Sequence, residues 1–174
     1  MTISGAQAII DPSADLPPAT DVYVVVDAGA FTGLSANEII NTYNFTTKAL
    51  ELGDAYEGGY LICQASSVQW VVAPSSAEIS RDWYSRNDAN TRAQQVSGCT
   101  GWFVPTCGQL QNPGFQCRTY WDSVPAAPGE FYWSSTERDG GNAWDVWFNP
   151  VSGAAYPCGK GGSNCVRAFR CVTY

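Results

Sequence analysis

The first informative absence in this 174-residue sequence is histidine, which does not occur at all. Without histidine no Ser-His-Asp or Cys-His catalytic arrangement can form, and the side chain most often used as a general base is missing. Mixed Cys/His zinc sites are excluded for the same reason. The sequence also contains no C-x-x-C pair, so a zinc ribbon is not expected. We therefore predict that the protein is not an enzyme and that it needs no cofactor or metal.

Charged residues are also scarce. They make up 14% of the chain, against roughly 25% in an average soluble domain, and the net charge is −7. No basic run occurs, so the clustered Lys and Arg that neutralise phosphates are missing. We expect no nucleic-acid partner.

Long apolar runs are missing too. No stretch approaches the roughly 18 apolar residues of a membrane span, so we expect no membrane insertion. The first 20 residues lack a basic segment followed by an apolar one. This predicts that there is no Sec-type signal peptide and that the chain is made in a cytoplasm.

The sequence contains seven cysteines, which is an unusually high number, and because the number is odd at least one of them must be unpaired. Several are either small buried apolar side chains or members of disulfides that form after the protein leaves a reducing cell. In the second case we expect Cys158 and Cys165 to form a disulfide that closes a loop.

The first 48 residues predict a small module of their own. Residues 1–20 are weakly patterned, as in a flexible arm, and residues 21–31 are rich in Val and read as a strand. Ser35 and Glu38 have the spacing of a capping box, which predicts a helix within residues 35–50. We interpret residues 1–48 as an attachment or oligomerisation module.

Residues 49–174 predict a second domain of short elements. Strands are expected at 59–64 and 68–73, joined by a polar turn, and a helix at 87–97. A short helix capped by Thr106 and Gln109 should end before Pro113. The C-terminal part returns to strands at EFYWSS, AWDVWFN and CVRAFRCVT. The chain therefore reads as α+β, with short helices and a twisted, mostly antiparallel sheet.

The aromatic segment 131–150 carries the candidate binding site. In AWDVWFN, strand alternation places Trp144 on one face and Asp145 and Trp147 on the other. An exposed ring beside amide and carboxylate groups can hold a sugar, because the ring stacks on the sugar's C–H face while its polar neighbours bind the hydroxyls. The alternative is that Trp147 packs under a loop or against a neighbouring subunit.

The loop within this segment, ERDGGN, supplies the remaining candidates. Its acidic and amide side chains are oxygen donors of the type that Ca²⁺ prefers, but no EF-hand spacing is present. A catalytic pair of Glu137 and Asp139 is less plausible than a solvated loop. The predicted ligand-binding residues are Glu137, Arg138, Asp139, Asn142, Asp145, Trp147, Asn149 and Tyr156.

Several motifs occur in the order typical of one family: GGYLIC, WVVAP, GWFVPTCGQLQ, FYWSSTE, NAWDVWF and VRAFR. Over about residues 50–174 the chain resembles the C-terminal domain of the Legionella collagen-like adhesin and its relatives, including the Fibrobacter major-paralogue repeats. The resemblance implies a C-type-lectin-like fold that displays variable loops, 137–142 and 154–164, from an aromatic core. It implies framework roles for Trp102, Pro105, Leu110, Tyr132, Trp133, Ser134, Ser135, Trp144, Val166, Arg167 and Arg170. The calcium triplets of sugar-binding animal lectins are not recognisable.

The resemblance also implies an adhesion module of a bacterial surface or a phage virion, and the expected absence of a signal peptide favours the virion. The protein would be a fibre tip or capsid decoration that binds a host-surface glycan or protein receptor. Its N-terminal module would bind other virion subunits, with a homotrimer as the expected assembly, and lysis would expose it outside the cell. The alternatives are a cement protein that contacts only neighbouring subunits, a bacterial surface adhesin, and a formylglycine-generating enzyme, for which no catalytic cysteine pair can be aligned.

Overall fold

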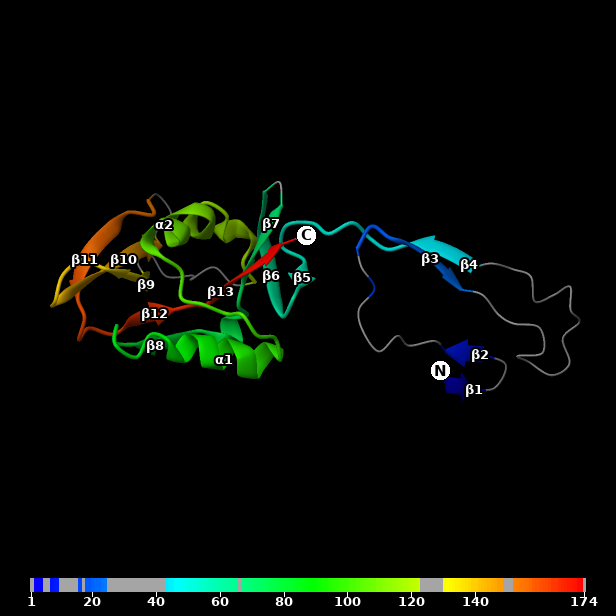
Figure 1. The fold of residues 1–174 in the computed structure, drawn as a ribbon, viewed down its shortest axis with the longest axis horizontal. Helices are drawn as coiled ribbons and strands as arrows, with labels where there is room; N and C mark the ends of the chain where they lie inside the picture. The colour runs from blue at the N-terminus through cyan, green and yellow to red at the C-terminus, as the bar shows by residue number, and fades with distance from the viewer. Residues whose placement is uncertain are drawn as a thin grey trace, which may run out of the picture. The chain divides into compact units, whose positions relative to one another are not determined.

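The structure is a computed structural model that describes residues 2–4, 7–9, 16, 18–24, 43–65, 67–122, 130–148 and 152–173. The chain divides into two compact units, Met1–Leu50 and Glu51–Tyr174. Figure 1 shows the elements of each unit, which are described separately below.

The first unit contains two antiparallel strand pairs. Strand β1 (Thr2–Ser4) pairs with β2 (Gln7–Ile9), and β3 (Asp21–Val24) pairs with β4 (Tyr43–Thr46). The strand predicted within residues 21–31 is confirmed for β3. The predicted helix is wrong over β4, because aromatic and β-branched residues favour a strand there and β3 supplies a hydrogen-bonding partner. Residues 25–42 lie outside the described residues.

The second unit contains a four-stranded antiparallel sheet of order β13-β7-β6-β5. Its strands are β5 (Ala55–Tyr56), β6 (Gly59–Ala65), β7 (Val68–Val72) and β13 (Phe169–Thr173). The predicted hairpin of two strands around residues 65–67 is confirmed. Gly59 is required where β6 begins, because a Cβ atom there would lie 2.2 Å from the Val72 carbonyl oxygen.

The second unit also contains a five-stranded sheet of order β11-β10-β9-β12-β8. Its strands are β8 (Ile79–Arg81), β9 (Glu130–Glu137), β10 (Asn142–Phe148), β11 (Ala155–Gly159) and β12 (Asn164–Val166). All of its pairings are antiparallel except β12 with β9. The insertion of β12 between β9 and β8 brings residues near the C-terminus into the middle of the sheet.

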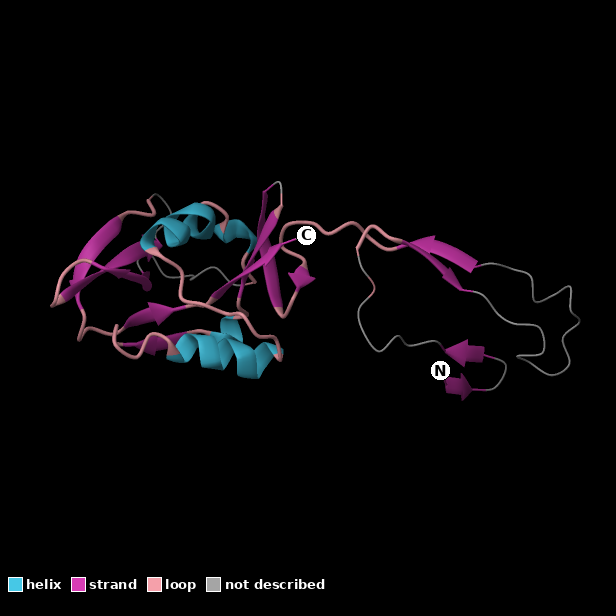
Figure 2. Cartoon of the chain, in the orientation of Figure 1, coloured by secondary structure: helices cyan, strands magenta, loops and turns pink. Residues whose placement is uncertain are grey.

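Short helices connect and cover these sheets (Figure 2). They are the 3₁₀ turn η1 (Ser75–Ala77), α1 (Asp88–Ser97), α2 (Cys107–Gln109), the π-type turn η2 (Leu110–Phe115) and the 3₁₀ turn η3 (Arg118–Tyr120). The predicted helix at 87–97 is confirmed by α1. The capping box is confirmed as well, since the Thr106 side chain accepts from the Gln109 amide and the Gln109 side chain accepts from the Thr106 amide.

The core consists of aromatic and aliphatic clusters on both faces of β9 and β10. One face packs Tyr132, Val146 and Phe148 against Leu110 and Phe115 of η2. The other face packs Trp133 and Ala143 with Trp83 and Ala89, the latter from α1. The fold is therefore α+β with mostly antiparallel sheets. In the part of the chain that the structure describes, no helix has the length and apolar character needed to cross a membrane.

Candidate functional site

The predicted site residues lie at two ends of the β9–β10 hairpin instead of in one patch. Ala143 pairs with Glu137 beside the connecting turn, whereas Trp147 pairs with Phe131 at the opposite end. With a rise of about 3.3 Å per residue, the four residues from Ala143 to Trp147 separate these ends by roughly 13 Å. The turn and the rings must therefore be considered as two surfaces.

The turn between β9 and β10 is organised by Asp139. Its Oδ1 atom accepts hydrogen bonds from the amides of Gly141 and Asn142, at 2.9 and 2.8 Å, and from the Asn142 side chain at 2.9 Å. These bonds, led by that from Gly141, hold the pKa of the Asp139 carboxyl below its usual range. Asp139 and Asn142 therefore fix the turn with their own polar groups.

A buried lysine holds the same turn from below. Lys160 is only 3% exposed, and its Nζ donates to the carbonyl oxygens of Asp139 (2.7 Å) and Gly140 (3.2 Å) and to the Glu137 carboxylate. The Lys160 amide also donates to the Gly141 carbonyl oxygen at 3.0 Å. One ammonium group thus closes the turn from the protein interior.

Two aromatic residues extend this surface. The Lys160 Nζ lies 4.6 Å from the centre of the buried Trp83 ring, and the Arg86 guanidinium covers that ring at 3.6 Å. Tyr84 contacts Trp83 edge-to-face, with ring centres 5.9 Å apart, and is 66% exposed. We define the turn surface as Tyr84 with the exposed residues Glu137–Gly141.

Arg138 is the basic group that the turn surface presents. Its side chain is half exposed, lies 3.9 Å from Asp139 in an ion pair, and sits 5.7 Å from the centre of the Trp144 ring. Trp144, for which the resemblance implies a framework role, is only partly buried. The reason is that Trp144 lies at the irregularity in the β9–β10 register, between Ala143 and Asp145, near the turn.

The second surface is an aromatic cluster of Phe131, Trp147 and Tyr156 on neighbouring strands. Trp147 stacks on Phe131 with an interplanar angle of 9° and ring centres 5.8 Å apart, and Tyr156 contacts both rings edge-to-face. Trp147 is partly buried, whereas Tyr156 is 44% exposed. The ring predicted to lie open on a surface is therefore half covered by its neighbours. Asn149 lies outside the described residues.

Asp145 is not available to an external ligand, contrary to the prediction. It is 2% exposed and lies on the sheet face that also carries Trp133 and Cys158. Its Oδ2 accepts a 2.8 Å hydrogen bond from Asn164, and burial raises the pKa of its carboxyl. The carboxylates of this segment already have donors within the protein, since Glu137 accepts from Lys160, Asp139 accepts from Asn142, and the buried Asp145 accepts from Asn164.

The structure does not bring together the two cysteines predicted to form a disulfide, because Cys158 lies on β11 and Cys165 on β12, and two strands, β10 and β9, lie between them in the sheet. The two thiols have separate carboxylate partners. The Cys165 Sγ donates to Glu130 at 3.3 Å, whereas the Asp145 carboxylate contributes, after burial, to the raised pKa of Cys158. Burial raises the pKa of both thiols.

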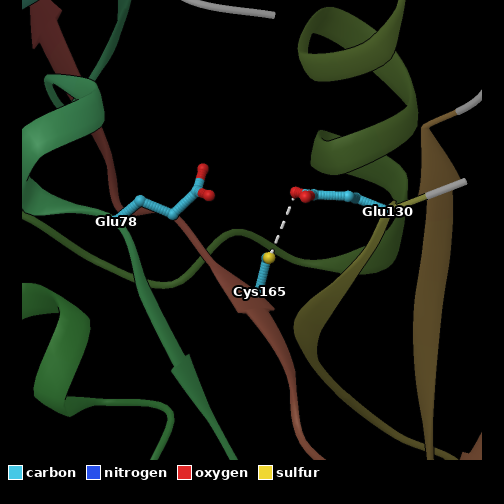
Figure 3. Close-up of side chains that lie close together, drawn as sticks. All are labelled: Glu78, Glu130 and Cys165. Atoms are coloured by element: carbon cyan, nitrogen blue, oxygen red, sulfur yellow. Dashed lines mark hydrogen bonds between the residues drawn. The ribbon is translucent and has the colours of Figure 1, made fainter. Parts of the chain in front are cut away.

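Among the described residues, one group of side chains has a composition that could hold a metal ion. Glu78, Glu130 and Cys165 have ligand atoms within 4.8 Å of one another (Figure 3). Their acceptors already have protein donors, because Tyr132 donates to Glu78 at 2.6 Å and Cys165 donates to Glu130. Burial and the charges of the two carboxylates hold the Cys165 pKa far above its usual range. A metal would have to displace this proton, so we treat the group as a structural network.

No sequence pattern identifies Tyr84 or Lys160 as a member of the site. Lys160 belongs to GKGGSN, which reads as a flexible turn. Neither family models nor curated protein sequences gave a match to this chain.

Proposed function

We propose that this chain is a virion structural protein, a fibre tip or capsid decoration, in which residues 51–174 form a C-type-lectin-like domain that binds a host-surface glycan or receptor. The observation that carries the proposal is the turn surface: Lys160 holds an exposed polar turn from the interior and lies over the Trp83 ring, which the exposed Tyr84 contacts. A fixed turn loses little conformational entropy on binding, which favours affinity. The α+β fold with connecting loops is compatible with a lectin-like domain.

The chemistry of the turn surface matches a polar, ring-stacking ligand. The Tyr84 ring offers an apolar face for the C–H groups of a sugar, and the exposed side chains of Arg138 and Glu137 offer donors and acceptors for hydroxyls. In this proposal the surface acts without catalysis and without a cofactor. Residues 1–48 attach the protein to other virion subunits as a homotrimer.

A cement protein that contacts only neighbouring subunits is the second candidate, and the aromatic cluster favours it. Phe131, Trp147 and Tyr156 form a contiguous apolar patch on one sheet face. Aromatic residues are enriched at subunit interfaces. In that case the cluster would be covered in the assembled particle, and the turn surface would have no ligand.

The test is to apply the purified full chain to a glycan array and to intact host cells, and in parallel to look for the chain in purified particles. The proposal predicts saturable binding to one glycan class or to the cells, together with copurification with particles. Copurification without binding to either would favour the cement protein. Absence from particles combined with binding would favour a bacterial adhesin.

A further inference from the structure

The turn between β9 and β10 contains the one Asp–Gly step of the sequence, Asp139-Gly140, and the sequence has no Asn–Gly step. Glycine has no Cβ atom that would keep its amide nitrogen away from the preceding side chain, so this step permits a reaction between the two. Both residues are exposed, and a Cβ atom added to Gly140 would meet nothing within 4 Å. Water therefore reaches the step.

The reaction open to such a step is isomerisation of the aspartate. The Gly140 nitrogen attacks Cγ of Asp139, the carboxyl OH and the amide proton leave as water, and a five-membered succinimide ring closes. A water molecule then adds to the main-chain carbonyl carbon of Asp139 and breaks the bond of that carbon to the Gly140 nitrogen. The product is isoaspartate, whose backbone runs through Cγ. One water leaves and one enters, and no oxidant or cofactor takes part.

The closed turn opposes ring closure through the Asp139 carboxylate. Its Oδ1 accepts from the amides of Gly141 and Asn142, and the Asn142 side chain donates to Oδ1 at 2.9 Å and to Oδ2 at 3.2 Å. Rotation of the carboxyl toward the Gly140 nitrogen would break these bonds. They also favour the charged carboxylate and hold its pKa low. The charged form reacts poorly, because its oxygen has to be protonated before it can leave as water.

Lys160 opposes ring closure through the backbone. Because a peptide unit is planar, the Asp139 carbonyl oxygen and the Gly140 nitrogen move together. The Lys160 ammonium holds that oxygen at 2.7 Å and the Gly140 carbonyl oxygen at 3.2 Å. Rotation of this peptide would therefore separate its oxygen from a lysine that is 3% exposed. Contacts on both sides of the step have to break before the ring can close.

We propose that Asp139 is a modification site, at which the closed turn prevents isoaspartate formation and an opened turn permits it. Isoaspartate adds one carbon to the backbone and removes one from the side chain, so the carboxylate would no longer fit the amides of Gly141 and Asn142. Closing the turn does not reverse this covalent change, so a converted turn remains altered. This inference does not depend on the proposed ligand.

The test follows the wild-type full chain, folded and unfolded in guanidinium chloride, at the same neutral pH and temperature. Isoaspartate is measured by isoaspartyl methyltransferase labelling and located by digestion with endoproteinase Asp-N, which cuts before aspartate but not before isoaspartate. The unfolded chain should form isoaspartate at residue 139 at least about tenfold faster than the folded chain, because only the opened fraction of the folded protein reacts. Equal rates, or no product at this residue in the unfolded chain, would overturn the proposal.

Variants of the folded chain test the contacts that hold the step. Lys160→Met should form isoaspartate at least about fivefold faster than the wild type, whereas Glu137→Gln, which keeps both carbonyl contacts of Lys160, should match the wild type. Asp139→Glu should form no product in either state, because its ring would be six-membered. A folded Lys160→Met chain that converts no faster than the wild type would also overturn the proposal. If that variant fails to fold, the comparison of folded and unfolded wild type still decides the outcome.

Discussion

Replacement of Lys160 by methionine tests whether the buried ammonium holds the turn. Methionine keeps the apolar stem packed near Trp83 but removes the donor to the Asp139 and Gly140 carbonyl oxygens. We expect the turn to lose its fixed conformation and the second unit to lose stability.

The size of the effect follows from the partners of the ammonium. Hydrogen bonds from a charged donor contribute roughly 1.5–3 kcal/mol each, and the turn carbonyls can regain part of this from water. The pair with Glu137 adds at most about 1 kcal/mol, because that side chain is 55% exposed. Removing a buried charge also relieves its desolvation cost. The net loss should be about 2 kcal/mol, which corresponds to roughly 8 °C in melting temperature for a unit of this size.

The assay combines thermal unfolding with amide hydrogen exchange of residues 138–142. Lys160→Met should lower the melting temperature and increase exchange of the Gly141 and Asn142 amides, which bond to Asp139 in the closed turn. The matched control is Glu137→Gln, which keeps both carbonyl contacts and should cost less than about 1 kcal/mol. Unchanged melting and exchange in Lys160→Met would refute the reasoning, and an equal loss in both variants would assign the effect to the ion pair.

Two further predictions concern the framework. Burial raises the folded-state pKa of Asp145, so the folded protein binds this proton more tightly than the unfolded chain does, and stability should rise as the pH falls from neutral through the folded pKa. Asp145→Asn should flatten this pH dependence in denaturant titrations between pH 4 and about 8. An unchanged slope of stability against pH would contradict the prediction. Gly59→Ala should destabilise the protein by at least about 3 kcal/mol, because the added Cβ would meet the Val72 carbonyl oxygen. The control is Gly108→Ala, which should be neutral because its Cβ meets nothing within 4 Å. Equal urea midpoints for the two variants would show that the backbone at Gly59 moves to make room for the Cβ.

Local signals made much of the second unit predictable. The β6–β7 hairpin follows from two apolar runs separated by a polar turn, and α2 begins at the capping box of Thr106 and Gln109. Each of these depends on residues close together in the chain. The predicted helix in the first unit failed over Tyr43–Thr46 because β4 depends on pairing with β3, whose residues lie 19 to 25 positions earlier in the chain.

The site was harder to predict because it depends on contacts between distant residues. Strand alternation correctly placed Asp145 and Trp147 on one face of β10. It could not show that residues distant in the chain, such as Trp83 and Ala89, pack over part of that face. Likewise, nothing local distinguishes Lys160 from a solvated lysine in a glycine-rich turn. Its role appears only when β11 pairs with β10 and brings it beneath Asp139.

The most direct test of the proposed function compares two exposed tyrosines in the ligand-binding assay. Tyr84 belongs to the turn surface and Tyr156 to the aromatic cluster, so the two alanine variants remove similar rings at different places. With ligand identified on the array, Tyr84→Ala should weaken binding by about tenfold, as expected for the loss of one stacking ring, and Tyr156→Ala should bind like the wild type. Loss of binding in Tyr156→Ala with full binding in Tyr84→Ala would contradict the assignment of the site to the turn surface.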